Sequence, residues 1–254
     1  MGAGHAHVLL HPGRSIVHRL SPQTKLVAAV GFVLVVVATP REQIWAFGLH
    51  GLLLVTVAAV ARVPARLISR RMLVETPFVI FAVLMPFLAR GERIDVLGIP
   101  MSVDGLWSAW NVLAKATLGV VCSILLAATT PLRDLLLGLE RLRMPALIVQ
   151  IMSFMIRYSD VIADEMRRMR IARESRGFVA RDLRQLPAVA RSAGALFIRT
   201  YERGERVHLA MVSRGYTGRM PSTDGGAAGR ADWTTALALP AAALTVAVAA
   251  WVLR

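Results

Sequence analysis

Ser175-Arg176-Gly177-Phe178 and Ser213-Arg214-Gly215-Tyr216 are two copies of one short phrase, Ser-Arg-Gly-aromatic, with their arginines 38 positions apart (214 − 176). Both copies lie in a highly charged segment, residues 131–221, which interrupts an otherwise apolar chain. Each copy closes a run of residues with helical periodicity. The repetition predicts a fold that presents two chemically matched helix ends, supported by the apolar remainder of the chain.

We predict three helices in this segment from its prolines and glycines. Proline is favoured in the first turn of a helix, and glycine just beyond its end. The predicted helices cover residues 132–143, 145–176 and 187–214, and each one is opened by a proline. Gly177 and Gly215 follow the second and the third of these helices.

The helix predicted over 145–176 is amphipathic. Its apolar residues recur in steps of three and four, which places them on one side. Four of them are methionines: Met152, Met155, Met166 and Met169. Because charged residues fill its C-terminal half, we predict that this helix does not span the membrane but lies beneath it, with its apolar side up. The alternative is that the methionines fill a protein core.

The helix predicted over 187–214 begins with small and apolar residues and becomes charged towards its C-terminus. Small residues allow two helices to cross closely. We therefore expect this helix to cross the one over 145–176, and both C-terminal ends to project the same way.

The rest of the chain suits a membrane. The protein has 254 residues, of which 56% are hydrophobic, and its mean hydropathy is +0.56. A helix needs about 20 residues to cross a bilayer. Five apolar blocks come near that length: Leu26–Thr39, Ile44–Ala61, Leu73–Ala89, Leu106–Thr130 and Ala236–Leu253. The predicted fold class is all-α, a polytopic membrane protein with about five transmembrane helices and a cytoplasmic insert of two to three amphipathic coupling helices.

We divide the chain into three parts. Residues 1–130 form an N-terminal cytoplasmic tail and four transmembrane helices, residues 131–221 the coupling-helix region, and residues 222–254 a flexible linker with the last transmembrane helix. Residues 90–105 contain several glycines among apolar residues, which predicts a short hairpin or an irregular loop.

The net charge of +14 sets the predicted orientation. Arginine and lysine concentrate in the N-terminal tail, in a basic loop predicted over residues 62–71 and in the insert, whereas residues 40–43 and 90–105 are nearly balanced. Cytoplasmic loops carry the excess of Lys and Arg. We therefore place the N-terminus and the insert in the cytoplasm and the C-terminus outside.

The two arginine ends suit a binding partner. Arginine carries a rigid planar fork of hydrogen-bond donors, and the dipole favours a cation at a helix C-terminus. Such an end fits a groove on a soluble protein and meets a carboxylate there. Ordinary helix capping by arginine and glycine is the alternative. The repetition favours partner binding through Ser175, Arg176, Gly177, Ser213, Arg214 and Gly215.

With these motifs the chain resembles the transmembrane (T) component of energy-coupling factor transporters, and most closely the cobalt-type, CbiQ-like branch. The resemblance is carried by Met169–Phe178, Phe197–Val207, Met211–Tyr216 and the opening phrase His18–Leu26. It covers nearly the whole chain. The family pattern often has Ala-Arg-Gly, where both motifs here have Ser-Arg-Gly.

The resemblance implies a coupling subunit that is not itself an enzyme. Two ABC-type ATPases bind the two arginine-tipped helices, and their closure on ATP moves the helices so that a membrane-embedded substrate-capture (S) component is toppled or released. In the cobalt branch that component captures the metal, often with a small auxiliary membrane subunit, for cobalamin synthesis. This chain then needs no cofactor, because ATP and Mg belong to the partner subunits. A nickel or vitamin transporter is the alternative within the family.

Other candidate residues have competing interpretations. His5, His7 and His11 are close enough to bind Co²⁺ or Ni²⁺, but a simple cytoplasmic tail accounts for them as well, and we predict no metal site. Asn111 and Lys115 are one helical turn apart within an apolar block, where an ionisable group is a functional candidate by default. We interpret them as a structural lock within the membrane.

Two functions of other classes compete with this one. A membrane-bound enzyme with a cytoplasmic catalytic insert needs convergent polar groups, and the insert offers mainly arginines and methionines, so we predict no catalytic residue. A nucleic-acid-binding protein needs a basic face with few acids. Here acids are interleaved with the arginines, among them Asp160, Asp164, Glu165, Glu174, Asp182, Glu202 and Glu205. The predicted partners are therefore proteins and the lipid bilayer of a prokaryotic cell membrane.

Overall fold

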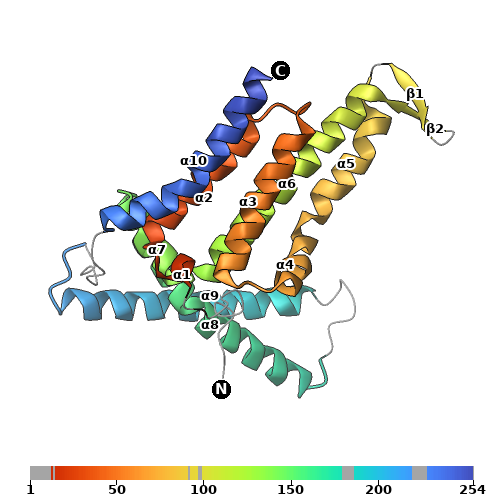
Figure 1. The fold of residues 1–254 in the computed structure, drawn as a ribbon. Coiled ribbons are helices and arrows are strands. Elements are labelled where there is room, and N and C mark those ends of the chain that lie inside the picture. The colour runs from red at the N-terminus through yellow and green to blue at the C-terminus, as the bar shows by residue number, and fades with distance from the viewer. Residues whose placement is uncertain are drawn as a thin grey trace. The chain divides into compact units, whose positions relative to one another are not determined.

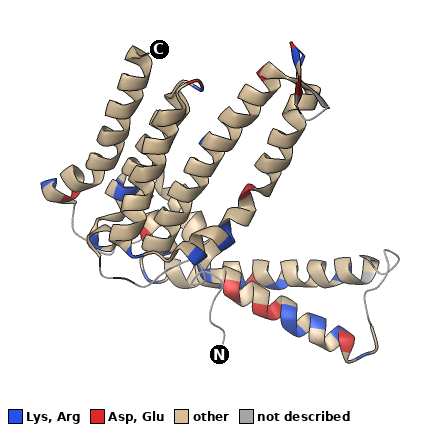
Figure 2. Cartoon of the chain, turned by 45° about the vertical axis from the view of Figure 1, so that its right-hand side comes forward, with Lys and Arg blue, Asp and Glu red and all other residues tan. Residues whose placement is uncertain are grey.

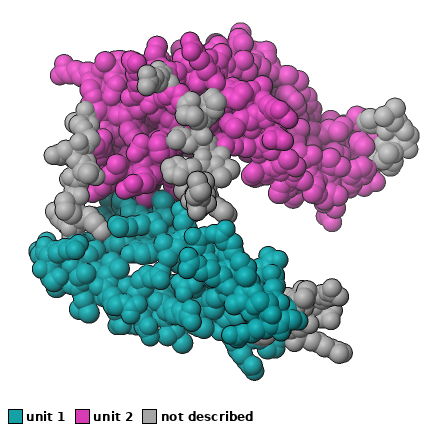
Figure 3. All heavy atoms as spheres, turned by 90° about the horizontal axis from the view of Figure 1, so that it is seen from below, with its two compact units in different colours: residues 1–8, 143–225 teal, residues 9–142, 226–254 magenta. Residues whose placement is uncertain are grey.

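The computed structural model describes residues 13, 15–90, 92–96, 99–178, 186–218 and 228–253. These residues divide into two compact units: unit 1 lies within residues 143–225, and unit 2 within residues 9–142 and 226–254 (Figure 3). The all-α class is confirmed, because the described residues form helices apart from one two-stranded hairpin (Figure 1). The helix after Pro131, which the sequence-based division assigned to the coupling region, groups with unit 2.

Unit 2 contains nine helical segments among the described residues and the hairpin. The segments are α1 (Ile16–Arg19), α2 (Pro22–Ala38), α3 (Ile44–Ala61), α4 (Ala65–Arg71), the 3₁₀ helix η2 (Met72–Glu75), α5 (Thr76–Leu88), α6 (Val103–Thr129), α7 (Leu132–Arg141) and α10 (Arg230–Val252). The strands β1 (Arg93–Val96) and β2 (Ile99–Ser102) pair antiparallel, with Arg93 opposite Ser102. Of the two forms predicted for residues 90–105, a short hairpin or an irregular loop, the structure contains the hairpin.

Five helices of the described chain are long and apolar enough to span a membrane: α3, the continuous run from α4 to α5, α6, α8 (Ala146–Glu174) and α10. The predicted number of five is confirmed, but the set differs. α8 qualifies by length and composition, because it contains a stretch that is long and apolar enough to span in spite of its charged C-terminal half. In turn, α2 has only 17 residues and is shorter than the others.

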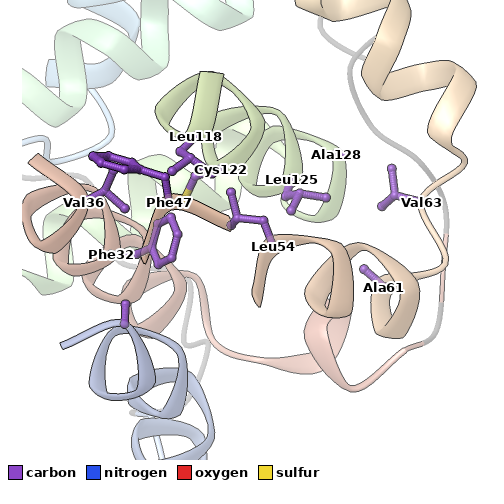
Figure 4. Packing of buried hydrophobic residues seen from close by; sticks show 11 residues of the cluster. Phe32, Val36, Phe47, Leu54, Ala61, Val63, Leu118, Cys122, Leu125 and Ala128 are labelled. Carbon is purple, nitrogen blue, oxygen red and sulfur yellow. The ribbon is translucent and has the colours of Figure 1, made fainter. Parts of the chain in front are cut away.

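The helices of unit 2 enclose a narrow apolar core. Phe32 and Val36 of α2 meet Phe47 and Leu54 of α3 there, together with residues of α6 (Figure 4). No more than 33% of any span of unit 2 is buried within the protein. The remaining apolar side chains face outward, as expected of helices surrounded by lipid, and Figure 2 shows charged residues gathered mainly at the helix ends of this unit. The chain is a multi-pass membrane protein.

Two lysines join α2 and α6. Near the start of α2, Lys25 Nζ donates hydrogen bonds to Thr129 O (3.1 Å) and Thr130 Oγ1 (3.2 Å) at the C-terminal end of α6. Near the other end of α2, Lys115 of α6 donates to Val37 O at 2.8 Å. Each lysine thus contacts the C-terminal end of the other helix, where the dipole favours a positive charge.

The crossing of α5 and α6 depends on a glycine. A Cβ atom at Gly105 would lie 2.7 Å from Pro86 Cα and 2.8 Å from Met85 O, and both of these atoms are backbone. Backbone atoms cannot move aside as the tip of a flexible side chain does. The absence of a side chain at Gly105 therefore sets how closely the two helices approach.

We predict that Gly105→Ala destabilises the protein by about 1–3 kcal/mol, the usual cost of overpacking a closely packed contact. The measurement is the midpoint of thermal unfolding of the purified protein in detergent. Gly119→Ala is the matched control, because nothing lies within 4 Å of a Cβ at Gly119 in the same helix. Alanine forms helix better than glycine, so the control should be neutral or stabilising. Equal midpoints for both variants would contradict the close crossing.

Candidate functional site

Both arginine motifs lie in unit 1. Its helices are α8, with 29 residues, and α9 (Leu186–Val212), with 27 residues. Pro145 is the N-cap of α8, and Pro187 lies in the first turn of α9, as predicted. Ser175 and Ser213 follow the last residues of the two helices.

The two helices end in the same hydrogen-bonded turn. In the first motif Gly177 N–H donates to Glu174 O (3.0 Å) and Phe178 N–H to Arg173 O (3.1 Å). In the second motif Gly215 and Tyr216 make the equivalent bonds to Val212 O and Met211 O, each at 3.0 Å. This pair of bonds is the Schellman motif, which leaves the glycine in the left-handed region. Accordingly, φ is +76° at Gly177 and +84° at Gly215.

The serines extend the equivalence of the two ends. Ser175 Oγ donates to Ala172 O at 3.1 Å, and Ser213 Oγ donates to Ala210 O at 3.0 Å. The repeated phrase is thus longer than four residues and reads Ala-x-x-Ser-Arg-Gly-aromatic. The alanines were missed in the sequence, although they are spaced by the same 38 positions (210 − 172) as the arginines.

The arginines of both motifs are available to a partner. Arg176 and Arg214 are exposed. Within the described chain, neither guanidinium group takes part in a hydrogen bond or an ion pair. Helix capping, the alternative for these ends, is performed by backbone and serine groups. The arginine forks therefore remain free of a role in capping.

The contacts between α8 and α9 pair the end of each helix with the start of the other. Arg173 donates to Ser192 Oγ at 3.0 Å, near the end of α8 and the start of α9. At the other end, Tyr216 Oη donates to Gln150 Oε1 at 2.7 Å. The helices are therefore antiparallel, and their C-terminal ends lie at opposite ends of the pair (Figure 1).

This arrangement corrects the expectation that both C-terminal ends project the same way. Helices joined by a short connection run antiparallel, and only seven residues, 179–185, separate Phe178 from the start of α9. Arg173 and Gln150 mark the two ends on α8 and are 23 positions apart (173 − 150). At 1.5 Å per residue, the two C-terminal ends are therefore separated by roughly 35 Å along α8.

A charged cleft of about 720 Å³ lies between the two helices. Five arginines line it: Arg168, Arg173, Arg176, Arg199 and Arg203. Among the described residues, two acids line it with them, Asp164 and Glu165. Glu165 accepts hydrogen bonds from Arg199 (3.2 Å) and Arg203 (3.4 Å). The cleft is consequently rich in positive charge at the end that carries Arg176.

The apolar side of α8 is not part of a core. Met155 is 67% exposed and Met166 is 45% exposed, and Val149 is the one buried residue that α8 has. The alternative that the methionines fill a core is therefore wrong for these two residues. An apolar surface of this kind needs lipid or another protein to cover it.

Other candidate residues lie elsewhere. Lys115 contacts Val37 O as described above, whereas Asn111 Oδ1 is buried without a hydrogen-bond partner. The structure therefore gives Lys115 a role in joining helices, and the lock formed with Asn111 stays a prediction. His5, His7 and His11 lie outside the described residues. In the described ranges, no group of three His, Cys, Asp or Glu residues is placed to hold a metal ion.

Comparisons with known proteins agree with this architecture. Residues 13–223 match the family model CbiQ, described as cobalt transport protein. The chain is 28% identical over 221 residues to the energy-coupling factor transporter transmembrane protein EcfT of Bacillus subtilis, covering 82% of this chain and 83% of the relative. It is 29% identical to the cobalt transport protein CbiQ of Rhodobacter capsulatus, covering 77% and 78%.

A third relative matches a shorter part of this chain. The uncharacterized protein MJ1089 of Methanocaldococcus jannaschii is 32% identical over 130 residues, which cover 50% of this chain and 48% of that protein. The fold and the paired helix ends define a multi-pass membrane protein with a two-helix unit. The family match, which extends over most of the chain, makes the assignment more specific: the chain belongs to the CbiQ family of cobalt transport proteins.

We predict that Gly177→Ala and Gly215→Ala each open the terminal turn. An L-residue in the left-handed region costs roughly 1–2 kcal/mol, so the amides of Phe178 and Tyr216 should exchange with deuterium at least about fivefold faster. The measurement is hydrogen–deuterium exchange of the full-length protein. Gly204→Ala is the control in the middle of α9, where a Cβ meets nothing within 4 Å. Unchanged exchange at both motifs would show that the turns do not depend on glycine.

Proposed function

We propose that this protein is the transmembrane (T) component of an energy-coupling factor importer. It transmits the motion of two cytoplasmic ABC-type ATPases to a membrane-embedded S component. The observation that carries this proposal is the pair of equivalent Ser-Arg-Gly ends at opposite ends of the antiparallel pair α8–α9. Relatives named as energy-coupling factor transporter transmembrane proteins support the same function.

Two equivalent ends suit two copies of one partner. A surface on one copy accepts Ser175, Arg176 and Gly177, and the same surface on the second copy accepts Ser213, Arg214 and Gly215. Copies of one protein assemble mostly around a two-fold axis, and a separation of roughly 35 Å along α8 leaves each end its own copy. ATP and Mg are then bound by the partners, and this chain takes part mechanically.

Arginine is suited to this contact for chemical reasons. Its planar guanidinium group bonds both oxygens of a carboxylate, and it stays charged when a partner removes water from it. The glycine that follows carries no side chain, which lets the groove of the partner close over the turn. We therefore expect each ATPase to offer a carboxylate in a groove that fits the tip of a helix.

The apolar side of α8 supports the second half of the mechanism. Its exposed residues include Leu147, Ile151, Met155, Ile162 and Met166. Methionine-rich surfaces adapt to different partners because the side chain is unbranched and flexible. We propose that this face lies beneath the bilayer and contacts the S component, whichever cargo that component holds. A small auxiliary membrane subunit lies beside it.

Cobalt is the proposed cargo. The matched family is described as cobalt transport protein, and one relative is named a cobalt transport protein, whereas others are named only as transmembrane proteins of energy-coupling factor transporters. A nickel or vitamin transporter is the alternative that these second names leave open. In either case we propose that the N-terminus and unit 1 lie in the cytoplasm, because these segments carry the excess of Lys and Arg that is typical of cytoplasmic loops.

We predict that the double variant Arg176→Glu/Arg214→Glu abolishes copurification of the ATPases while the protein still inserts into the membrane. Each glutamate would face the carboxylate that the arginine met. Arg157→Glu/Arg206→Glu is the matched control, since it reverses two exposed arginines of the same helices. Full recovery of ATPases with the first variant, or an equal loss with the control, would refute the assignment of these ends.

We further predict that cells expressing this chain with its ATPases and S component accumulate radioactive cobalt above cells that lack this chain. The double variant Arg176→Glu/Arg214→Glu should reduce uptake to background, because the motion of the ATPases no longer reaches the membrane. Parallel assays with labelled nickel and with vitamins test the cargo. Uptake of nickel or of a vitamin without cobalt would overturn the cargo and leave the coupling role standing.

A further inference from the structure

Arg62 adopts a backbone conformation that normally belongs to glycine. It follows the last residue of α3 with φ 55° and ψ 34°, in the left-handed region. Glycine is the usual residue where a helix ends in this conformation, and other residues are disfavoured there by their Cβ atom. A strained position that keeps a long cationic side chain points to a use for that side chain.

Two further arginines stand close to Arg62 in the chain. Arg66 and Arg70 are one turn apart on α4 and therefore share a side of this helix. All three arginines are exposed, and none of their guanidinium groups makes a hydrogen bond or an ion pair within the described part of the protein. No acid lies in the chain between Arg62 and Met72. Their charge is thus not compensated locally.

The segment is anchored on its other side. Val63 is buried in the core of unit 2, and Leu67 and Ile68 pack against that core. These contacts hold α4 in place and leave Arg66 and Arg70 at the surface. Arg66 and Arg70 therefore form a cationic surface on an ordered helix, and Arg62 precedes that helix in the chain.

Apolar side chains are exposed directly beyond the arginines. Leu73 is 74% exposed and Val74 is 71% exposed, and both lie in η2, which continues α4. The next acid, Glu75, is buried and accepts a hydrogen bond from Thr117. Cationic residues followed within one turn by exposed apolar residues are typical of the boundary between lipid headgroups and acyl chains.

We propose that Arg62, Arg66 and Arg70 form a binding platform for the phosphodiester headgroup of an anionic phospholipid. The guanidinium forks bind phosphate oxygens, while Leu73 and Val74 contact the acyl chains of the same lipid. A free phosphate ion would satisfy the arginines but would leave the two apolar residues in water. The platform is independent of the proposed transport function, since it needs neither the ATPases nor a cargo.

The test is lipid binding to the full-length protein in a neutral detergent. Phosphatidylglycerol and phosphatidylcholine are titrated separately, and the shift in thermal unfolding is followed by tryptophan fluorescence. The wild-type protein should be stabilised more by phosphatidylglycerol than by phosphatidylcholine. Inorganic phosphate is titrated in a third arm, and stabilisation by phosphate equal to that by phosphatidylglycerol would overturn the assignment to a lipid.

Arg66→Gln/Arg70→Gln should raise the concentration of phosphatidylglycerol that gives half of the thermal shift by roughly 30-fold. Each basic side chain near an anionic surface contributes about fivefold to the affinity. Arg90→Gln/Arg93→Gln is the matched control, as it removes two exposed arginines near the hairpin, at the other end of α5. Should the control lose as much as the first variant, or should the first variant respond like the wild type, the platform is refuted.

Arg62→Gly gives a second and independent readout. It should raise the unfolding midpoint in neutral detergent, because glycine tolerates φ 55°. It should also weaken the binding of phosphatidylglycerol, so that the concentration that gives half of the thermal shift rises by about fivefold. These two effects have opposite signs, which a variant that merely misfolds does not produce. A more stable variant with an unchanged lipid response would remove Arg62 from the platform.

Discussion

The hydrogen bond from an aromatic residue's N–H back to the carbonyl five residues earlier determines what unit 1 presents to its surroundings. A helix leaves its last four carbonyl groups without partners, and this bond, made by Phe178 and by Tyr216, satisfies one of them. It requires a left-handed residue just before the aromatic, which is Gly177 or Gly215. Because backbone groups complete the turn, Arg176 and Arg214 stay exposed. Helix capping and partner binding are therefore compatible, since the capped turn is what presents the arginine.

The antiparallel contacts place the two arginine ends at opposite ends of unit 1. Arg199 and Arg203 both donate to Glu165, which joins the middle of α8 to α9. Tyr216 adds a bond to Gln150 that Phe178 cannot make, because phenylalanine has no hydroxyl group. The two ends are thus alike in backbone geometry but differ in their attachment to the neighbouring helix. Their placement at opposite ends is the reason why the proposed function assigns one partner molecule to each end.

The positions of the helices were largely predictable from the sequence, because prolines, glycines and apolar blocks are local signals. The block Ile44–Ala61 was predicted with the bounds that α3 has. The direction of α9 relative to α8 was predicted wrongly, since it depends on pairs such as Arg173 and Ser192 that no local pattern encodes. For the same reason the helical form of residues 65–71 was missed: a dense run of arginines suggests a loop, whereas Leu67 and Ile68 pack against the core.

Lys115, which lies within an apolar block, shows how a charged side chain can join two membrane helices. Backbone carbonyls have no water to bond in a bilayer, and the last four of α2 each find a donor. Thr39 bonds Val35 O and Val36 O through its hydroxyl and its N–H, Lys115 bonds Val37 O, and Trp251 bonds Ala38 O. Lys25 serves the end of α6 in the same way through Thr129 O. A cation at the negative end of a helix dipole is stabilised there, so each lysine satisfies a carbonyl and binds α2 to α6 at once.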